Sequence, residues 1–197
     1  MAIELAGMRH CAPMTLSLFT YTLLTALIFF VLGLLFLFGR PGWREAVCRF
    51  PRSDLAAYLT MGIGGGWFLY TISQLSPADE LFGPATRSVL LVVFGITWIG
   101  SFFVVKDFLA VRGLAVLVLM CAATGLAKAF GEYEIPARLL LVSVLYVLIV
   151  IAIYLGVSPF RWRDFFNWLF ADNRRNRLMG SVFTLCGILL AGAAFAY

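Results

Sequence analysis

The sequence is poor in residues that bind metals. It has a single histidine, His10, and its four cysteines form no CxxC pair. Structural zinc sites, haem sites with paired histidines and iron–sulfur clusters need more of these ligands at closer spacing. The apolar segments also contain no carboxylate pair and no Ser–His arrangement for acid–base or nucleophilic catalysis. We therefore expect no metal and no cofactor, and we predict that the chain is not an enzyme.

Charge is also scarce. Charged residues make up 13% of the 197 residues and hydrophobic residues 62%, whereas a soluble domain carries roughly 25% charged residues. Near the centre of the apolar runs there is no Asp, Glu, Lys, Arg or His. Ion-coupled transporters, pumps and voltage sensors keep such groups inside the membrane because they use them. The sequence therefore favours a membrane protein and disfavours coupled transport.

Six apolar runs are long enough to cross a bilayer, which takes about 20 helical residues. They cover residues 14–38, 55–75, 87–105, 112–130, 137–157 and 178–197. The first run is too long for the apolar core of a signal peptide, so we expect it to be a retained helix. The predicted fold is an all-α polytopic membrane protein with one transmembrane domain over residues 1–197. It has about six transmembrane helices arranged as three hairpins, with short interfacial helices.

Basic residues gather in the odd-numbered connections between these runs. The first connection has Arg40, Arg44, Arg49 and Arg52, the third has Lys106 and Arg112, and the fifth has Arg161, Arg163, Arg174, Arg175 and Arg177. The even-numbered connections carry the acidic residues Asp79, Glu80, Glu132 and Glu134. By the positive-inside rule the odd connections are cytoplasmic. We predict a membrane location, the cytoplasmic membrane of a bacterium, with both termini outside.

Three pieces of the chain resemble one another weakly. Trp43-Arg44-Glu45 recurs as Trp162-Arg163-Asp164, and Lys106-Asp107 lies about midway between them. This spacing suits three hairpin repeats over residues 14–75, 87–130 and 137–197. The alternative is that helices entering from the same interface acquired similar boundary residues independently.

The fifth connection has the pattern of an amphipathic helix. Its large apolar residues fall at positions i, i+3, i+4, i+7 and i+8, namely Trp162, Phe165, Phe166, Leu169 and Phe170. We predict a helix from about Pro159 to Ala171 that lies at the membrane surface, and a shorter one after Trp43. The residues predicted to contact lipid headgroups or a partner are Arg161, Arg163, Arg174, Arg175, Arg177, Arg44 and Arg49. The alternative is a basic anchor that only fixes the topology.

The second apolar run contains glycines and polar aromatic residues. Gly62 and Gly66 form a GxxxG step, which predicts a seam where another helix approaches closely. A possible cavity lining consists of Trp67, Tyr70 and Gln74 on this run, with Trp98 and Ser101 on the next. Aromatic residues at this spacing also serve simply as packing.

Two functions from different classes remain open. The first is an integral membrane scaffold or accessory subunit that packs against other membrane proteins and anionic lipid, without catalysis of its own. The second is a small uncoupled transporter or channel for a neutral solute. A water-accessible path to the membrane midplane, lined by polar side chains, would distinguish the second from the first. Nucleic acid is not an expected partner, because the basic residues alternate with apolar spans.

Overall fold

The computed structural model describes residues 17–39, 41–75, 85–104 and 108–197, and within them every regular element is helical. The elements are α1 (Leu18–Phe38), α2 (Pro41–Arg49), the 3-10 helix η2 (Phe50–Arg52), α3 (Asp54–Ser73), α4 (Thr86–Val104), α5 (Leu109–Ala129), α6 (Arg138–Val157), α7 (Phe160–Phe170) and α8 (Asn173–Ala194). Predicted residues Arg40, Asp79, Glu80, Lys106 and Asp107 lie outside the described ranges. The middle copy of the proposed repeat therefore has no structural description.

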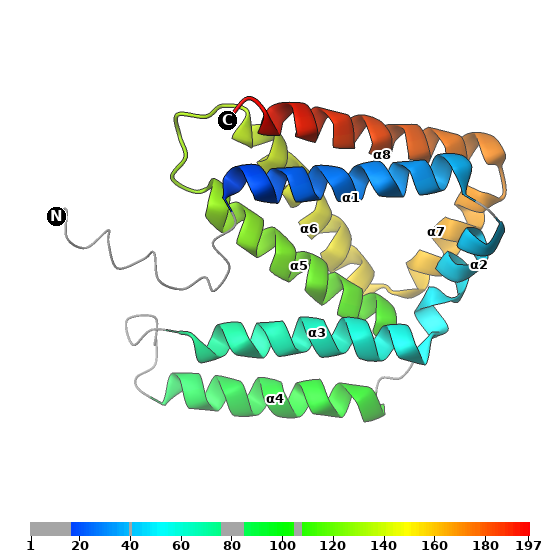
Figure 1. Cartoon of the computed structure of the whole chain (residues 1–197). Coiled ribbons are helices and arrows are strands. Elements are labelled where there is room, and N and C mark those ends of the chain that lie inside the picture. The colour runs from blue at the N-terminus through cyan, green and yellow to red at the C-terminus, as the bar shows by residue number, and fades with distance from the viewer. Residues whose placement is uncertain (1–16, 40, 76–84, 105–107) are drawn as a thin grey trace.

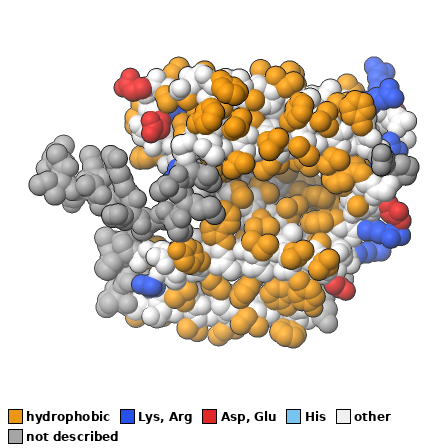
Figure 2. All heavy atoms as spheres, in the orientation of Figure 1, with side chains coloured by type: hydrophobic (Ala, Val, Ile, Leu, Met, Phe, Trp, Pro, Cys, Tyr) orange, Lys and Arg blue, Asp and Glu red, His pale blue; other side chains and the backbone are white. Residues whose placement is uncertain are grey.

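The six predicted spans are confirmed as helices. In the described residues α1, α3, α4, α5, α6 and α8 are long and apolar enough to cross a membrane. In Figure 1 α1, α3, α4 and α8 run roughly parallel, and α5 and α6 are tilted relative to them. The short helices α2 and α7 lie across one end of the bundle. Apolar side chains cover the middle of the face in Figure 2, and most of its charged side chains lie toward the two ends. This distribution fits a bilayer, where charge is stable only near the headgroups.

The arrangement as three sequential hairpins is not confirmed. The most extensive contact of α1 is with α8, the last long helix of the chain. The two helices run antiparallel (Figure 1). α5 occupies the centre and packs against both α3 and α6. Neither α1 with α3 nor α4 with α5 is among the well-packed pairs, although each pair would form one predicted hairpin. The most extensive contact therefore joins the first and the last long helix, whereas α3 with α4 and α5 with α6 are pairs of consecutive spans.

Small residues hold α1 against α8. On α8, Gly180 and Gly187 are seven residues apart and both are buried, and on α1 so are Ala26 and Gly33. A Cβ atom at Gly187 would lie 2.8 Å from the backbone nitrogen of Phe30 and 2.9 Å from the carbonyl oxygen of Ala26. Small residues at helical repeats let backbones approach in this way, and the close approach supplies the van der Waals contact that joins helices in lipid.

The contact between α3 and α5 follows the same rule. A Cβ atom at Gly113 of α5 would lie 2.5 Å from the backbone nitrogen of Met61. The Thr60 hydroxyl lies 2.8 Å from the Ala56 carbonyl oxygen of its own helix and 3.1 Å from the Ala110 carbonyl oxygen of α5. A polar link of this kind stabilises helix pairs in lipid, where no water competes for the hydroxyl.

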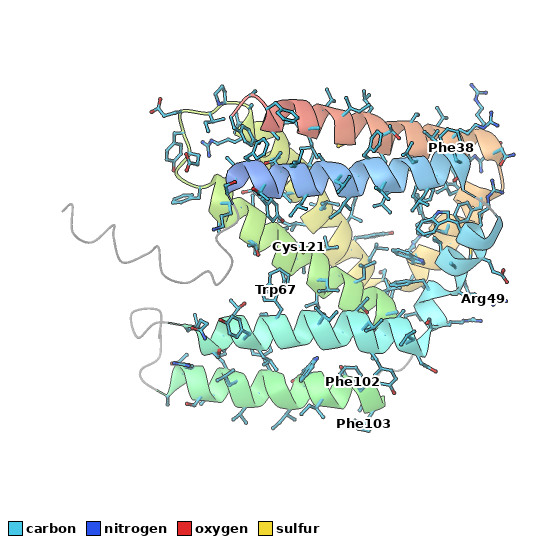
Figure 3. The ribbon with its side chains drawn as sticks, viewed as in Figure 1. Phe38, Arg49, Trp67, Phe102, Phe103 and Cys121 are labelled. Atoms are coloured by element: carbon cyan, nitrogen blue, oxygen red, sulfur yellow. The ribbon has the colours of Figure 1, made fainter. Side chains whose placement is uncertain are left out.

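α4 is the least embedded span. It has no buried residue, and its one well-packed neighbour among the described helices is α3. The indole of Trp98 lies against Gly65 of α3 and donates a 2.9 Å hydrogen bond to the Met61 carbonyl oxygen. Phe102 stacks on Tyr58 with ring centroids 5.6 Å apart, whereas Phe103 projects away from α3 (Figure 3). α4 is thus attached along one side and leaves its other sides open.

α8 begins earlier than predicted. The expected span starts at Leu178, but the helix starts at Asn173, because the Asp172 carboxylate caps it by accepting a 2.9 Å hydrogen bond from the backbone nitrogen of Arg174. Arg174, Arg175 and Arg177 are therefore side chains of the first turns of a helix and not of a connecting loop. The hydropathy pattern missed this start because three arginines precede the apolar run.

Candidate functional site

The end of the bundle that carries α2 and α7 contains a cluster of stacked aromatic rings, which we call the aromatic cap. Its centre is Phe36, near the end of α1. The ring centroid of Phe36 lies 6.2 Å from those of Trp43 and Phe166, 6.3 Å from that of Phe170 and 5.9 Å from that of Phe183. Four helices, α1, α2, α7 and α8, therefore meet at one ring.

The predicted apolar stripe of α7 is largely confirmed. The helix covers Phe160–Phe170, within the predicted range, and it buries Phe166 and Leu169 while Asn167 is exposed. Phe165 departs from the prediction because its side chain is exposed. The stripe packs on Phe36, Val47 and Met179, which belong to α1, α2 and α8. Its buried side therefore meets protein, and the predicted position of the helix in the headgroup plane stays a prediction.

Hydrogen bonds connect the short helices to the bundle. The Trp162 indole donates to the Val47 carbonyl oxygen at 3.1 Å, which joins α7 to α2. The Arg44 guanidinium donates to the Asn173 side-chain oxygen at 2.6 Å and lies 5.6 Å from the ring centre of Phe170. These interactions link α2 and α7 to each other and to the start of α8.

Asn176 is a buried polar residue that the sequence analysis did not single out. Its side chain is 4% exposed, and its amide nitrogen donates a 2.6 Å hydrogen bond to the Phe36 carbonyl oxygen. That carbonyl is among the last four of α1, which have no partner within the helix. Asn176 therefore supplies a hydrogen-bond donor to one of the terminal carbonyl groups of α1. The signal that could have revealed it is its position four residues before Gly180, on the face that packs against α1.

The seven arginines of the predicted contact set all lie on α2, α7 and the start of α8, at one end of the bundle. Several are already engaged by neighbours. Arg49 pairs with Glu45 at 2.6 Å and Arg163 with Asp164 at 3.4 Å. Arg44 donates a hydrogen bond to the Asn173 side chain. The Arg175 guanidinium lies 4.6 Å from the ring centre of Trp168, and the Arg161 guanidinium lies 5.5 Å from that of Phe160. The sequence alone could not separate engaged arginines from available ones, and the contact of this set with lipid headgroups or a partner stays a prediction.

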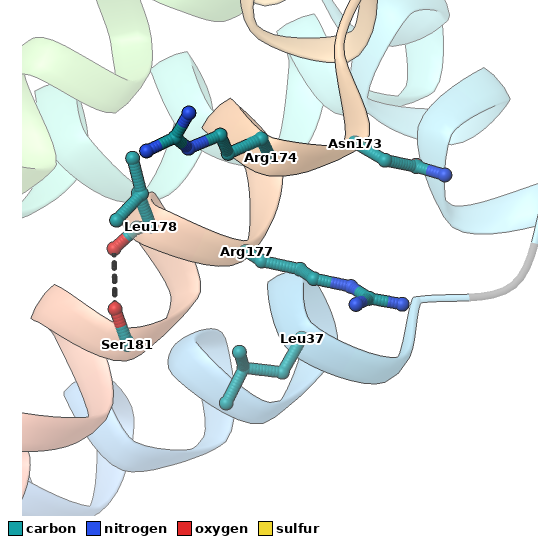
Figure 4. Close-up of a pocket in the computed structure, with 6 residues that line it drawn as sticks. All are labelled: Leu37, Asn173, Arg174, Arg177, Leu178 and Ser181. Atoms are coloured by element: carbon teal, nitrogen blue, oxygen red, sulfur yellow. Dashed lines mark hydrogen bonds between the residues drawn. The ribbon is translucent and has the colours of Figure 1, made fainter.

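An open hollow of about 520 Å³ lies beside the start of α8 (Figure 4). It is lined by Leu37, Asn173, Arg174, Arg177, Leu178 and Ser181. In Figure 4 Arg174 lies above Leu178 and Arg177 above Leu37, so each basic side chain has an apolar one beneath it. A second open hollow lies between α6 and α8 and is lined mainly by apolar residues such as Leu140, Val144 and Leu185.

The predicted glycine seam is not used inside the described chain. A Cβ atom at Gly62 or Gly66 would meet no described atom within 4 Å. The close approaches occur at Gly64, against α5, and at Gly65, against Trp98. Gly64 is two residues from both members of the GxxxG step and so lies about 200° around the helix from them. The GxxxG motif is present, but it faces away from α5, and its use by another subunit stays a prediction.

The five residues of the predicted cavity lining do not gather at a described hollow. Trp98 is engaged with Gly65 and Met61, and the Ser101 hydroxyl donates to the Trp98 carbonyl oxygen at 2.7 Å. Trp67 projects from α3 on the side away from α4 (Figure 3). Tyr70 and Gln74 are exposed. None of the five lines either of the two open hollows described above, and a cavity lined by them stays a prediction.

These features define the class of the protein: the chain is a helical membrane protein, with six candidate transmembrane helices in the part of the chain that the structure describes. No group of three or more His, Cys, Asp or Glu side chains that could hold a metal occurs among the described residues. No protein-family model matches the chain, and neither the curated proteins nor the solved structures include one with significant similarity to it.

Proposed function

We propose that the protein is an integral membrane scaffold or accessory subunit that packs against other membrane proteins and contacts anionic lipid, without catalysis of its own. The observation that carries the proposal is the outer flank formed by α3 and α4. α4 has no buried residue and packs well only on α3 among the described helices. Gly62 and Gly66 give the same flank an open strip without side chains. Helix contacts in lipid need such close approach, so this flank suits a further transmembrane helix.

The basic end supports the second part of the proposal. In a cytoplasmic orientation its arginines would face the anionic leaflet, where each basic side chain contributes about 1 kcal/mol to surface attraction. The aromatic cap gives this end a fixed shape because four helices pack on Phe36. A rigid basic surface fits a docking role better than a mobile tail would, since it loses less conformational entropy on binding.

The test of subunit packing uses Gly66→Leu in the full chain. We expect the wild-type protein, extracted in mild detergent from its native membrane, to carry a second membrane protein in fixed stoichiometry. Gly66→Leu should lose that protein, because the leucine side chain fills the open strip. Gly192→Leu is the matched control: Gly192 also has no described atom within 4 Å of its Cβ position, but it lies on α8. Retention by Gly66→Leu, or equal loss by both variants, would contradict the proposal.

The orientation is tested by labelling single cysteines with a membrane-impermeant reagent. We expect a cysteine in place of Glu132, which is exposed in the connection before α6, to react in intact cells. A cysteine in place of Asn173, at the opposite end of the bundle, should react only after permeabilisation. The physical reason is the excess of arginine around Asn173, which the positive-inside rule places in the cytoplasm. The reverse pattern would invert the proposed topology.

A further inference from the structure

The hollow beside α8 combines charge and apolar surface on a single helix face. Arg174, Arg177, Leu178 and Ser181 fall at positions i, i+3, i+4 and i+7, so they start from one face of α8. Leu37 of α1 closes the hollow from the other side. The Ser181 hydroxyl donates to the Leu178 carbonyl oxygen at 2.8 Å. In Figure 4 the Arg174 and Arg177 side chains extend to opposite sides at the rim of the hollow, with Leu178 beneath the first and Leu37 beneath the second.

The two arginines at this rim have available guanidinium groups. Within the described part of the chain neither guanidinium forms an ion pair, a hydrogen bond or a ring contact, in contrast to Arg44, Arg49 and Arg175. The nearby Asp172 carboxylate is committed to capping α8. An anion would therefore be held by side chains, and the capped backbone at the helix start is not the binding element. Guanidinium groups bind phosphate oxygens strongly because their N–H groups form a planar fork.

The surface below the arginines continues as exposed apolar side chains. Leu178, Val182 and Leu185 are 57%, 60% and 59% exposed and follow one another along α8. A soluble phosphate compound has no apolar part that could cover this surface. A molecule with a phosphate at one end and hydrocarbon chains at the other would contact both parts at once, since burying apolar surface is favourable in proportion to its area.

We infer that the hollow is a binding site for one anionic glycerophospholipid, with its headgroup at the side chains of Arg174 and Arg177 and an acyl chain along Leu178, Val182 and Leu185. The inference rests on the proposed membrane function and deepens it by naming the lipid class. A zwitterionic headgroup fits less well, because its ammonium group would lie among arginines and be repelled by them. An anionic headgroup meets two basic side chains at this rim, and the nearby Asp172 carboxylate is held at the helix start by its hydrogen bond to the Arg174 backbone nitrogen.

The test is a titration of the purified chain in detergent with phosphatidylglycerol, with bound lipid counted by native mass spectrometry. We expect Arg174→Gln/Arg177→Gln to weaken binding about tenfold, a change in Kd well above the scatter of such measurements. Arg87→Gln/Lys128→Gln removes the same charge at the opposite end of the bundle, outside the predicted contact set, and should bind within about twofold of wild type. Arg174→Lys/Arg177→Lys keeps the charge and should show an intermediate loss, because lysine lacks the planar fork.

Two further arms identify the source of the phosphate. Phosphatidylcholine should bind more weakly than phosphatidylglycerol, and excess inorganic phosphate should not displace the bound lipid. Equal loss in both glutamine pairs would show general surface attraction and overturn the site, as would displacement by phosphate or equal binding of phosphatidylcholine. The titration uses the chain without a partner, and Gly66→Leu should bind lipid as the wild type does. Failure of the lipid site is therefore distinguishable from failure of subunit packing.

Discussion

Replacing Gly33 with leucine is expected to separate α1 from α8 and to cost roughly 3 kcal/mol or more of folding free energy, at the upper end for overpacked sites. A Cβ atom at this position would overlap the Thr184 hydroxyl and lie 2.5 Å from the Thr184 backbone nitrogen and 2.9 Å from the Gly180 carbonyl oxygen. Backbone atoms cannot rotate aside as a side chain can, so the two helices themselves must move apart. Unfolding of the purified protein in detergent, followed by circular dichroism, measures the loss.

Gly66→Leu is the control for this experiment. It introduces the same side chain into a membrane helix, but no described atom lies within 4 Å of the new Cβ position. Leucine also favours a helix over glycine by about 0.5–1 kcal/mol. The isolated chain should therefore melt at the wild-type temperature or slightly above it. If Gly33→Leu were as stable as Gly66→Leu, the packing of α1 on α8 by small residues would be contradicted.

Phe166→Asp is expected to destabilise the protein by about 3–5 kcal/mol, the range for truncating a buried aromatic residue or leaving a buried charge unpaired. The Phe166 ring is 9% exposed and lies 4.7 Å from the Trp162 ring and 5.7 Å from the Phe170 ring, between centroids. A carboxylate there would lose both its hydration and the stacked rings. A lowered melting temperature, with loss of the tryptophan near-UV signal of the aromatic cap, is the expected measurement.

Asn167→Asp, at the next position, supplies the matched comparison. Asn167 is exposed, so the same new charge stays hydrated and should change stability by less than about 0.5 kcal/mol, as surface substitutions usually do. Equal destabilisation by the two variants would mean that α7 does not bury its predicted face. Greater destabilisation by Asn167→Asp would mean that the side of α7 carrying Asn167, and not the side carrying Phe166, is the buried one.

The sequence predicted the candidate site in part. The spacing of apolar residues in α7 correctly places Phe166 on the buried side of the helix and Asn167 on the exposed side. This worked because α7, unlike a membrane-spanning helix, has one apolar and one polar side. The arginines were also found, since charge is rare in this chain. Asn176 was missed because it lies within a run of arginines that looks uniformly polar. Only the packing of α8 on α1 turns it inward, toward the Phe36 carbonyl oxygen.

By itself, the sequence determined the class of fold and the number of long helices, because the length of each apolar run is set by the thickness of the bilayer core. The tertiary structure alone decided which helices pair: α1 with α8, α5 at the centre and α4 at the edge. The reason is that a membrane helix is apolar all round, so hydropathy does not mark its buried side. Pairing depends instead on where small residues let backbones meet. Gly62 and Gly66 have the expected spacing, yet other glycines touch a neighbouring helix, among them Gly33, Gly64 and Gly187.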